Sequence, residues 1–182
     1  EDAVGLIDVE WQALPTVVDF RVAANTGQPQ IHAAAPNNIA GHLVQVVGEP
    51  ESAFRDAAHV FEESLFVERS CGSPIEARGV VAVWDARRQA LTVWDGTQAP
   101  LTIKNGLAGM LGLPEFSVDV VAPDVGGGFG TKIMLFFAEE VLVPWAAVRL
   151  ERPVKWTEDR REHFIAANQE RGQSHRARVA VD

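Results

Sequence analysis

The glycine-rich stretch Gly126-Gly127-Gly128-Phe129-Gly130 constrains the fold more than any other part of the sequence. It follows an alternating apolar segment at 117–122, which predicts a strand, and precedes a segment at 132–149, which predicts a helix. Consecutive glycines permit a tight turn with positive φ, and they let another group approach the backbone closely because no Cβ intervenes. The sequence therefore predicts a strand, a tight loop and a helix, with loop amides able to point at one anionic group at the helix N-terminus.

This glycine loop matches neither of the two common phosphate-binding motifs. A Walker loop has glycine directly before its lysine, whereas Thr131 precedes Lys132 here. The dinucleotide fingerprint needs a glycine five residues after its first one, and that position is also Thr131. A tight structural turn and an anion site both stay open as interpretations of the loop.

Composition excludes several classes of protein. The chain has 182 residues, of which 47% are hydrophobic and 23% charged, as is typical of a folded globular protein. Its net charge is −9 and no basic stripe is present, so we expect no nucleic-acid partner. No apolar run approaches the roughly 18 residues that span a bilayer, so we expect no membrane span. The single cysteine, Cys71, favours a reducing compartment and hence the cytoplasm, with the periplasm as the alternative.

The order of the expected elements favours an α+β fold. Alternating or β-branched segments predict strands at 6–11, 60–70, 78–84, 91–94, 117–122, 153–157 and 175–182, and helices are expected at 51–59, 100–111 and 132–149. Proline, glycine and asparagine interrupt residues 25–50, which we interpret as a linker between 1–24 and a domain at 51–182. Because the chain starts without methionine and its last residues alternate like an unfinished strand, we expect it to be part of a longer protein.

Few residues stand out as chemical groups on their own. Gln98 follows an expected strand end, where loop residues often carry function, and its amide could donate to an oxo or carbonyl group. Glu139 and Glu140 are adjacent on the expected helix, so at best one faces a site, and a solvated helix face is the alternative. The cluster Glu158–Glu162 predicts ion pairs among its own residues, each with the small stabilisation typical of surface pairs. The histidines lack metal-ligand spacing and predict surface or capping roles; they are His32, His42, His59, His163 and His175.

Four segments, in this order and spacing, resemble a known family: Pro74–Gly79 (PIEARG), Thr97–Pro100 (TQAP), Val121–Gly130 (VAPDVGGGFG) with Lys132, and Pro153–Arg160 (PVKWTEDR). They are similar to the molybdopterin-binding large subunit of the molybdenum hydroxylases, which include xanthine dehydrogenase, aldehyde oxidase and aerobic CO dehydrogenase. The resemblance covers nearly the whole chain. It implies the end of a hammerhead-type domain near the start, followed by the first part of a molybdopterin-binding mixed α/β domain.

The resemblance implies roles for particular residues. Gln98 matches the glutamine that hydrogen-bonds an oxo ligand of the molybdenum centre, and the loop positions Gly127, Gly128, Phe129 and Gly130 match residues that contact the pterin cofactor. None of them is a direct metal ligand. Ile133 falls where purine-oxidising relatives carry a substrate-binding glutamate, and Arg171 lies near an active-site arginine of relatives. An apolar residue at 133 therefore argues against a purine substrate.

The resemblance also implies an activity and partners. It implies an oxidoreductase that hydroxylates an aldehyde, CO or a related carbon substrate with oxygen from water, and that passes electrons to iron–sulfur and FAD subunits or domains. The general-base glutamate of the family falls beyond Asp182, so we expect the chain to be inactive without the rest of the large subunit. Two alternatives stay open: a non-catalytic assembly module that completes a split or degenerate large subunit, and an independent nucleotide or phosphate binder.

Overall fold

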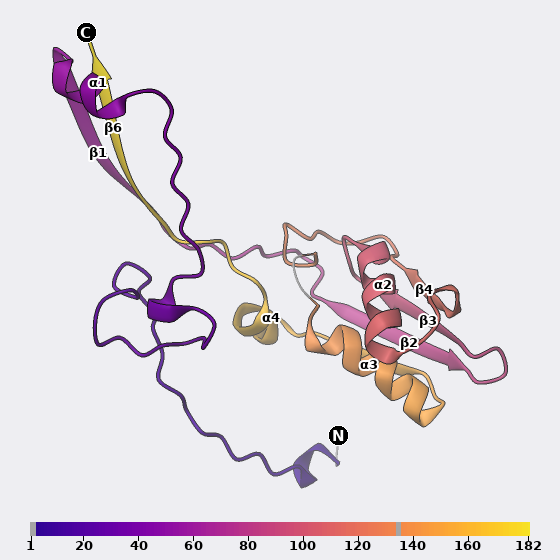
Figure 1. Ribbon diagram of the computed structural model, residues 1–182. Helices are drawn as coiled ribbons and strands as arrows, with labels where there is room; N and C mark the ends of the chain where they lie inside the picture. Colours follow the sequence, from indigo (N-terminus) through magenta and orange to yellow (C-terminus); the bar gives the residue numbers. More distant parts are fainter. Residues whose placement is uncertain (1–2, 134–135) are drawn as a thin grey trace. The chain divides into compact units, whose positions relative to one another are not determined.

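The computed structural model describes residues 3–133 and 136–182 (Figure 1). Contacts within the chain define two compact units, Glu1–Val67 with Gly172–Asp182, and Glu68–Arg171. The division into 1–24, 25–50 and 51–182 stays a prediction, whereas the mixed arrangement of helices and strands confirms the expected α+β class.

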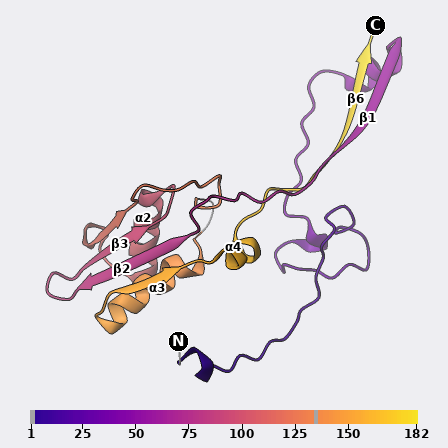
Figure 2. The same cartoon turned by 180° about the vertical axis from the view of Figure 1, so that it is seen from behind.

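The Glu68–Arg171 unit is built on a four-stranded sheet with the order β4-β3-β2-β5. The strands β2 (Gly79–Asp85) and β3 (Ala90–Asp95) form the expected antiparallel hairpin, and β5 (Val154–Thr157) pairs antiparallel with β2. The fourth strand, β4 (Val118–Val121), runs parallel to β3, and the helix α2 (Pro100–Leu111) connects the two (Figures 1 and 2). A crossover is required there because parallel neighbours cannot be joined by a hairpin turn.

The helices of this unit confirm one expectation and correct another. As predicted, α2 starts at Pro100 and ends at Gly112, whose φ of 66° is left-handed. The helix expected at 132–149 begins later: α3 spans Ala138–Leu150, and residues 131–133 form a turn, while residues 134 and 135 lie outside the described residues. The helix begins where the Glu140 carboxylate accepts the Phe137 N–H and so satisfies a donor that the first helical turn leaves free. A short 3-10 turn, η3 (Glu115–Ser117), precedes β4, and α4 (Arg160–Ala166) follows β5.

The core lies between the sheet and the two longer helices. Alternation along the strands puts Val80 and Ala82 of β2 on one face together with Leu91 and Val93 of β3, and these side chains are almost completely buried. The helices cover this face with their own buried side chains, which are Ile103, Leu107, Ala108, Val143 and Ala147. The same alternation carries two charged residues, Arg78 and Asp95, to the buried side of the sheet.

Two glycines of α2 test this packing, because they differ in what a side chain would meet. A Cβ on Gly106 would overlap the Phe136 ring, whereas a Cβ on Gly109 would meet nothing within 4 Å. We expect Gly106→Ala to lower the free energy of unfolding by about 1–3 kcal/mol through overpacking. Gly109→Ala is the matched control and should raise it by about 0.5–1 kcal/mol, since alanine favours the helix. Urea denaturation of both variants measures the difference, and equal effects would contradict this packing.

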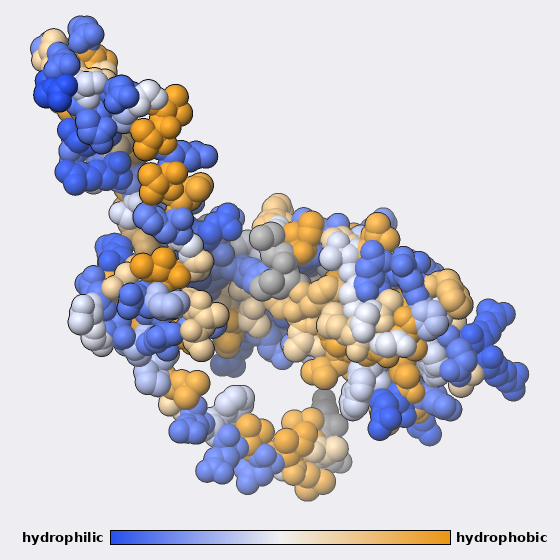
Figure 3. All heavy atoms as spheres, viewed as in Figure 1, coloured by the Kyte–Doolittle hydropathy of each residue, from blue (hydrophilic) through white to orange (hydrophobic). Residues whose placement is uncertain are grey.

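The second unit contains the antiparallel pair β1 (His59–Val67) and β6 (Gln173–Val181), with α1 (Pro50–Asp56) and the short 3-10 turns η1 (Val4–Leu6) and η2 (Pro36–Asn38). Apolar side chains reach the surface along this pair (Figure 3); they are Val60, Phe61, Leu65, Phe66, Val67, Val179 and Val181. The strand expected at 6–11 is wrong, because no neighbouring strand of the described residues pairs with it. Among the described residues, no helix is long and apolar enough to cross a membrane.

Candidate active site

Gln98 lies just after β3, on the connection that leads into α2. Its backbone N–H donates to the Lys132 carbonyl at 3.0 Å, and its side-chain Oε1 accepts the Gly130 N–H at 3.2 Å. A Cβ on Gly128 would overlap the Gln98 amide carbon and oxygen. The amide is thus held by its oxygen against the glycine loop, and within the described part of the chain its Nε2 donates to no acceptor. An exposed side chain fixed in this way offers two N–H groups to a ligand.

The loop uses several of its amides for its own structure. Gly126 N–H donates to the Glu76 carboxylate at 2.8 Å, and Thr131 N–H donates to the Gly128 carbonyl at 2.9 Å. With the Gly130 N–H bound to Gln98, two loop amides and that of the adjacent Thr131 already have protein acceptors. The expected helix N-terminus is also absent at the loop, because α3 begins only at Ala138. These observations favour a loop that holds Gln98 over one that surrounds a phosphate with its amides.

Phe129 has an unusual backbone conformation in the loop. Its φ is 51°, in the left-handed region that a bulky residue seldom adopts, and its neighbours Gly127 and Gly130 have φ values of 96° and 84°. Its side chain is 71% exposed. Strained residues of this kind cluster at ligand sites, where the surrounding structure maintains them. The loop therefore presents an exposed aromatic ring, and the cofactor contact expected of Phe129 stays a prediction.

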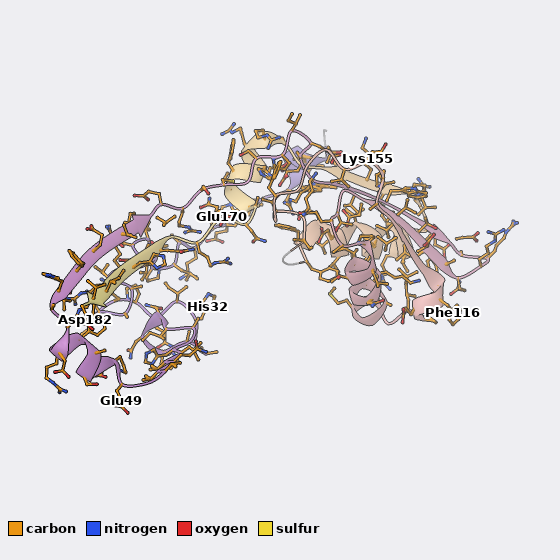
Figure 4. The ribbon with its side chains drawn as sticks, turned by 90° about the horizontal axis from the view of Figure 1, so that it is seen from above. His32, Glu49, Phe116, Lys155, Glu170 and Asp182 are labelled. Carbon is orange, nitrogen blue, oxygen red and sulfur yellow. The ribbon has the colours of Figure 1, made fainter. Side chains whose placement is uncertain are left out.

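A cavity of about 650 Å³ adjoins the loop inside the Glu68–Arg171 unit. Its lining comes from the segment before β2, the glycine loop and the residues in and after α4: Arg69, Gly72, Phe129, Gly130, Ile165, Ala167, Asn168, Gln169, Glu170 and Arg171. Figure 4 labels Glu170, whose backbone N–H donates to the Ser70 carbonyl at 2.7 Å and joins two of these segments. Among the described residues, the buried side-chain Nδ2 of Asn168 has no hydrogen-bond partner. The cavity thus combines an aromatic ring with the side chains of two arginines.

The structure brings most of the predicted site residues together. Gln98 contacts Gly128 and Gly130, while Phe129, Gly130 and Arg171 line one cavity. Ile133 follows the loop with a side chain that is 45% exposed, and it does not line that cavity. Among the described residues, no group of three or more His, Cys, Asp or Glu side chains is arranged to hold a metal ion.

A buried ionic group beneath the site was missed from the sequence. Glu158 is fully buried, accepts hydrogen bonds from the Arg78 backbone and guanidinium at 2.7–3.0 Å, and lies 3.0 Å from His163 Nδ1. Burial alone would raise the pKa of Glu158, but the hydrogen bonds from Arg78 and His163 bring it below its usual value. The prediction that Glu158 pairs within the cluster Glu158–Glu162 is therefore wrong, because its partners are Arg78, 80 residues earlier, and His163 of α4.

His163 corrects the expectation that the histidines have surface or capping roles, because its ring is completely buried. Its Nδ1 faces the ionised Glu158 carboxylate, and its Nε2 lies 2.8 Å from the Gly72 carbonyl. Both partners are acceptors, so the two hydrogen bonds form together only when both ring nitrogens carry protons. Gly72 in turn lies against Phe129, since a Cβ on Gly72 would contact that residue. His163 therefore supports the segment against which Phe129 packs.

Two further carboxyl groups are buried close to the site. Burial raises the pKa of Asp95 to about 6, against the opposing effect of Arg78 and Lys132, and no hydrogen-bond partner of its Oδ2 lies in the described part of the chain. Burial also raises the pKa of Glu140 to about 7, assisted by the negative charge of Asp95. Glu140 is only 6% exposed, so the alternative of a solvated helix face does not apply at this position.

Replacing Glu140 with glutamine should make stability less dependent on pH. An unfolded glutamate has a pKa near 4.3, so the folded chain binds the extra proton between about pH 4 and pH 7 and loses stability as pH rises through that range. Glutamine keeps an acceptor for the Phe137 N–H and does not ionise. We expect the stability of Glu140→Gln relative to wild type to rise by about 2–3 kcal/mol between pH 5 and pH 8.

Urea denaturation at the two pH values measures this effect, with the exposed Glu151→Gln as control. A stability difference that does not change with pH would show that Glu140 ionises normally in the folded protein.

Comparison with known proteins identifies the family. Residues 31–182 match the family model described as molybdopterin cofactor-binding domain. The whole chain is 35% identical to the 6-hydroxypseudooxynicotine dehydrogenase complex subunit gamma of Paenarthrobacter nicotinovorans and covers 22% of that protein. Over 90% of its length, the chain is 32% identical to the carbon monoxide dehydrogenase large chain of Afipia carboxidovorans, and it covers 22% of that protein as well.

The structure points the same way. The chain superposes over its whole length on quinoline 2-oxidoreductase from Pseudomonas putida 86, with a TM-score of 0.83, 34% identity and coverage of 23% of that chain. It thus spans about a fifth of the length of the curated relatives it matches. Family match, sequence identity and fold agree with the four motifs in the sequence. The chain belongs to the molybdopterin cofactor-binding domain family, within the large subunits of the molybdenum hydroxylases.

Proposed function

We propose that this chain supplies one part of the active site of a molybdenum hydroxylase, in which a small molecule is hydroxylated at carbon with oxygen from water. The observation that carries the proposal is the Gln98 amide, whose oxygen is fixed by the Gly130 N–H while its Nε2 remains available as a donor. In the family, the matching glutamine contacts the cofactor. The geometry of Gln98 supports the same role here.

The residues present fit a molybdenum–molybdopterin cofactor. Gly128 leaves space that a Cβ would fill, so the loop approaches the Gln98 amide closely. The exposed Phe129 ring lines the adjoining cavity together with the Arg171 side chain, so the cavity offers both apolar contact and hydrogen-bond donors to a ligand. When bound, the cofactor supplies the two-electron oxidation chemistry of the reaction. The chain's own part is to orient the cofactor through the Gln98 N–H groups and to exclude water with the Phe129 ring.

The proposed substrate is a small carbon compound, such as an aldehyde, CO or a related molecule. The relatives described above are named for 6-hydroxypseudooxynicotine, carbon monoxide and quinoline. Ile133 replaces the glutamate that binds purines in other members, which supports a heteroaromatic or aldehyde substrate without purine hydrogen bonding. Arg171, at the cavity wall, is proposed to contact the substrate or its oxygen atoms.

Other parts of the proposed enzyme lie outside these residues. Iron–sulfur and FAD subunits or domains would accept the electrons, and the general-base glutamate would come from large-subunit sequence beyond this chain. The chain alone is therefore proposed to bind cofactor weakly and to show no turnover. The single cysteine supports a cytoplasmic location.

The test is a Gln98→Ala variant of the assembled enzyme. We expect molybdenum and pterin, measured by elemental analysis and by fluorescence of the released pterin, in the wild-type protein. The variant should show a kcat lower by roughly a hundredfold, because one preorganised donor is lost. The exposed Gln12→Ala is the matched control and should leave both readouts unchanged. Wild-type protein without molybdenum, or a Gln98→Ala variant with normal kcat, would refute the proposal.

The second candidate is a non-catalytic assembly module. It is favoured by the exposed apolar side chains along β1 and β6, since a two-stranded sheet is seldom stable without further packing. A stable complex with a separate large-subunit chain that lacks molybdenum would support this candidate. Molybdenum and turnover in that same complex would instead support the hydroxylase.

A further inference from the structure

Lys132 is a buried cation directly after the glycine loop. Its side chain is 1% exposed, and its Nζ donates to the Glu76 carboxylate at 2.8 Å. A buried ammonium group is costly unless it is paired and hydrogen-bonded. Lys132 therefore needs the Glu76 carboxylate as its partner, whereas an apolar residue of the same size would need none. The other contacts of Glu76 indicate the role of this ion pair.

Glu76 connects Lys132 to the beginning of the loop. The same oxygen, Oε2, accepts both the Lys132 Nζ and the Gly126 N–H, each at 2.8 Å. In return, the Glu76 N–H donates to the Gly126 carbonyl at 3.2 Å. This close approach needs glycine, because a Cβ on Gly126 would lie 2.6 Å from the Glu76 Cβ. The hydrogen bonds from Lys132 and Gly126 lower the pKa of Glu76, so its carboxylate is ionised and the pair is a true ion pair.

The backbone of Lys132 connects the end of the loop to Gln98. The Lys132 carbonyl accepts the Gln98 N–H at 3.0 Å and the Thr97 hydroxyl at 3.1 Å. Thr97 is itself buried, and its Oγ1 accepts the Ala99 N–H where α2 begins. Lys132 is thus connected to the first loop residue through the Glu76 carboxylate, and it binds the Gln98 segment through its own backbone carbonyl.

We propose that Glu76 and Lys132 are positioning residues, which join both ends of the glycine loop and thereby fix the Gln98 amide for contact with the cofactor. The proposal rests on the proposed function for its catalytic consequence only. The effect of the ion pair on the order of the loop and of Gln98 does not depend on the proposed function. Neither side chain is placed in contact with the cofactor, and both act through Gly126 and Gln98.

The first test measures loop order by hydrogen exchange in the assembled enzyme. Lys132→Met keeps the apolar length of the side chain and removes the charge. We expect the amides of Gly126 and Gln98 to exchange on the order of ten- to a hundredfold faster than in wild type, because local opening becomes easier. Adding Glu76→Gln to this variant removes the unpaired carboxylate and retains an acceptor for Gly126. The double variant should therefore recover much of the protection at Gly126.

A core variant separates positioning from general stability. Leu107→Val truncates a fully buried side chain of α2 in the hydrophobic core, so it lowers stability while both members of the ion pair are kept. We expect its loop amides to stay protected. Unchanged exchange at Gly126 and Gln98 in Lys132→Met would overturn the proposal, as would equal acceleration in Leu107→Val.

The second test separates this inference from the proposed function. In the cofactor-loaded enzyme, Lys132→Met should lower kcat roughly ten- to a hundredfold, because misplaced groups lose rate steeply, and should release the cofactor faster. Faster loop exchange in a protein that never contains molybdenum would sustain the positioning role and refute the hydroxylase. Faster loop exchange with an unchanged kcat and cofactor release in a molybdenum-containing enzyme would refute the link to Gln98 and leave the hydroxylase standing.

Discussion

Replacing Arg78 with methionine is expected to lower the free energy of unfolding by about 3–5 kcal/mol, since it leaves Glu158 charged and buried without its main partner. The Arg78 guanidinium makes two hydrogen bonds to Glu158 Oε1, at 2.7 and 2.9 Å, and lies 3.5 Å from the centre of the Phe137 ring. Methionine retains part of the packing but none of the charge. Urea denaturation at pH 7 measures the loss.

Two variants interpret the Arg78 result. Arg88→Met removes an arginine from an exposed pair with Asp85 at 3.7 Å, and its cost should stay below about 1 kcal/mol. Adding Glu158→Gln to Arg78→Met removes the unpaired charge and keeps an acceptor for His163, so it should restore part of the stability. A loss for Arg78→Met as small as that for Arg88→Met would mean that the guanidinium is not needed in the fold.

Gly128→Ala should lower kcat of the proposed hydroxylase on the order of a hundredfold, with a much smaller effect on stability. The new Cβ overlaps the end of the Gln98 side chain, which is flexible enough to move aside, so the fold tolerates the change. The loss of kcat arises because the side-chain amide of Gln98 is displaced. Steady-state kinetics measures kcat, and a crystal structure of the variant should show Gln98 in a different rotamer.

Gly109→Ala is the control for a glycine whose Cβ meets no neighbouring atom. It adds the same methyl group in α2 instead of the glycine loop, and it should therefore leave kcat unchanged. A Gly128→Ala variant with normal kcat and an unmoved Gln98 would contradict the close packing of the loop against this amide.

The sequence predicts well those features that are encoded by neighbouring residues. The hairpin of β2 and β3 follows from β-branched alternation around a polar turn, and the ends of α2 follow from Pro100 and Gly112. Gln98 and Gly130 lie 32 residues apart, so no local pattern links them, and only the order of the motifs predicted that Gln98 and the loop belong to one site. Their geometry, including the free Nε2, could be seen only in the structure.

Features that depend on distant partners were missed for a physical reason. Lys132 and Glu76 are 56 residues apart, and Arg78 and Glu158 are 80 apart, so no local pattern marks either pair as buried. One signal was available: strand alternation puts Arg78 and Asp95 in phase with Val80 and Val93. A charge at a core position of a predicted strand indicates a buried partner elsewhere in the chain.

Residues 6–11 show the opposite error, since a local strand pattern is present without a partner. Alternation alone does not form a strand, because backbone hydrogen bonds require a neighbour. The late start of α3 has a similar cause: the Lys132 carbonyl, which could have accepted a helical hydrogen bond, accepts the Gln98 N–H and the Thr97 hydroxyl.

The hydrogen bond between Ser70 and Glu170 has a consequence for how this fold can be rearranged. Together with the bridge between Cys71 and Gln169, it brings the two ends of the Glu68–Arg171 unit side by side. A segment with adjacent ends can be moved as a block between host chains, because closing it adds little loop entropy. The Glu68–Arg171 unit therefore has ends that a short linker could join, which would permit circular permutation. The same geometry would allow relatives to exchange this unit as a whole, with its cavity wall, while they retain β1 and β6 on either side of it.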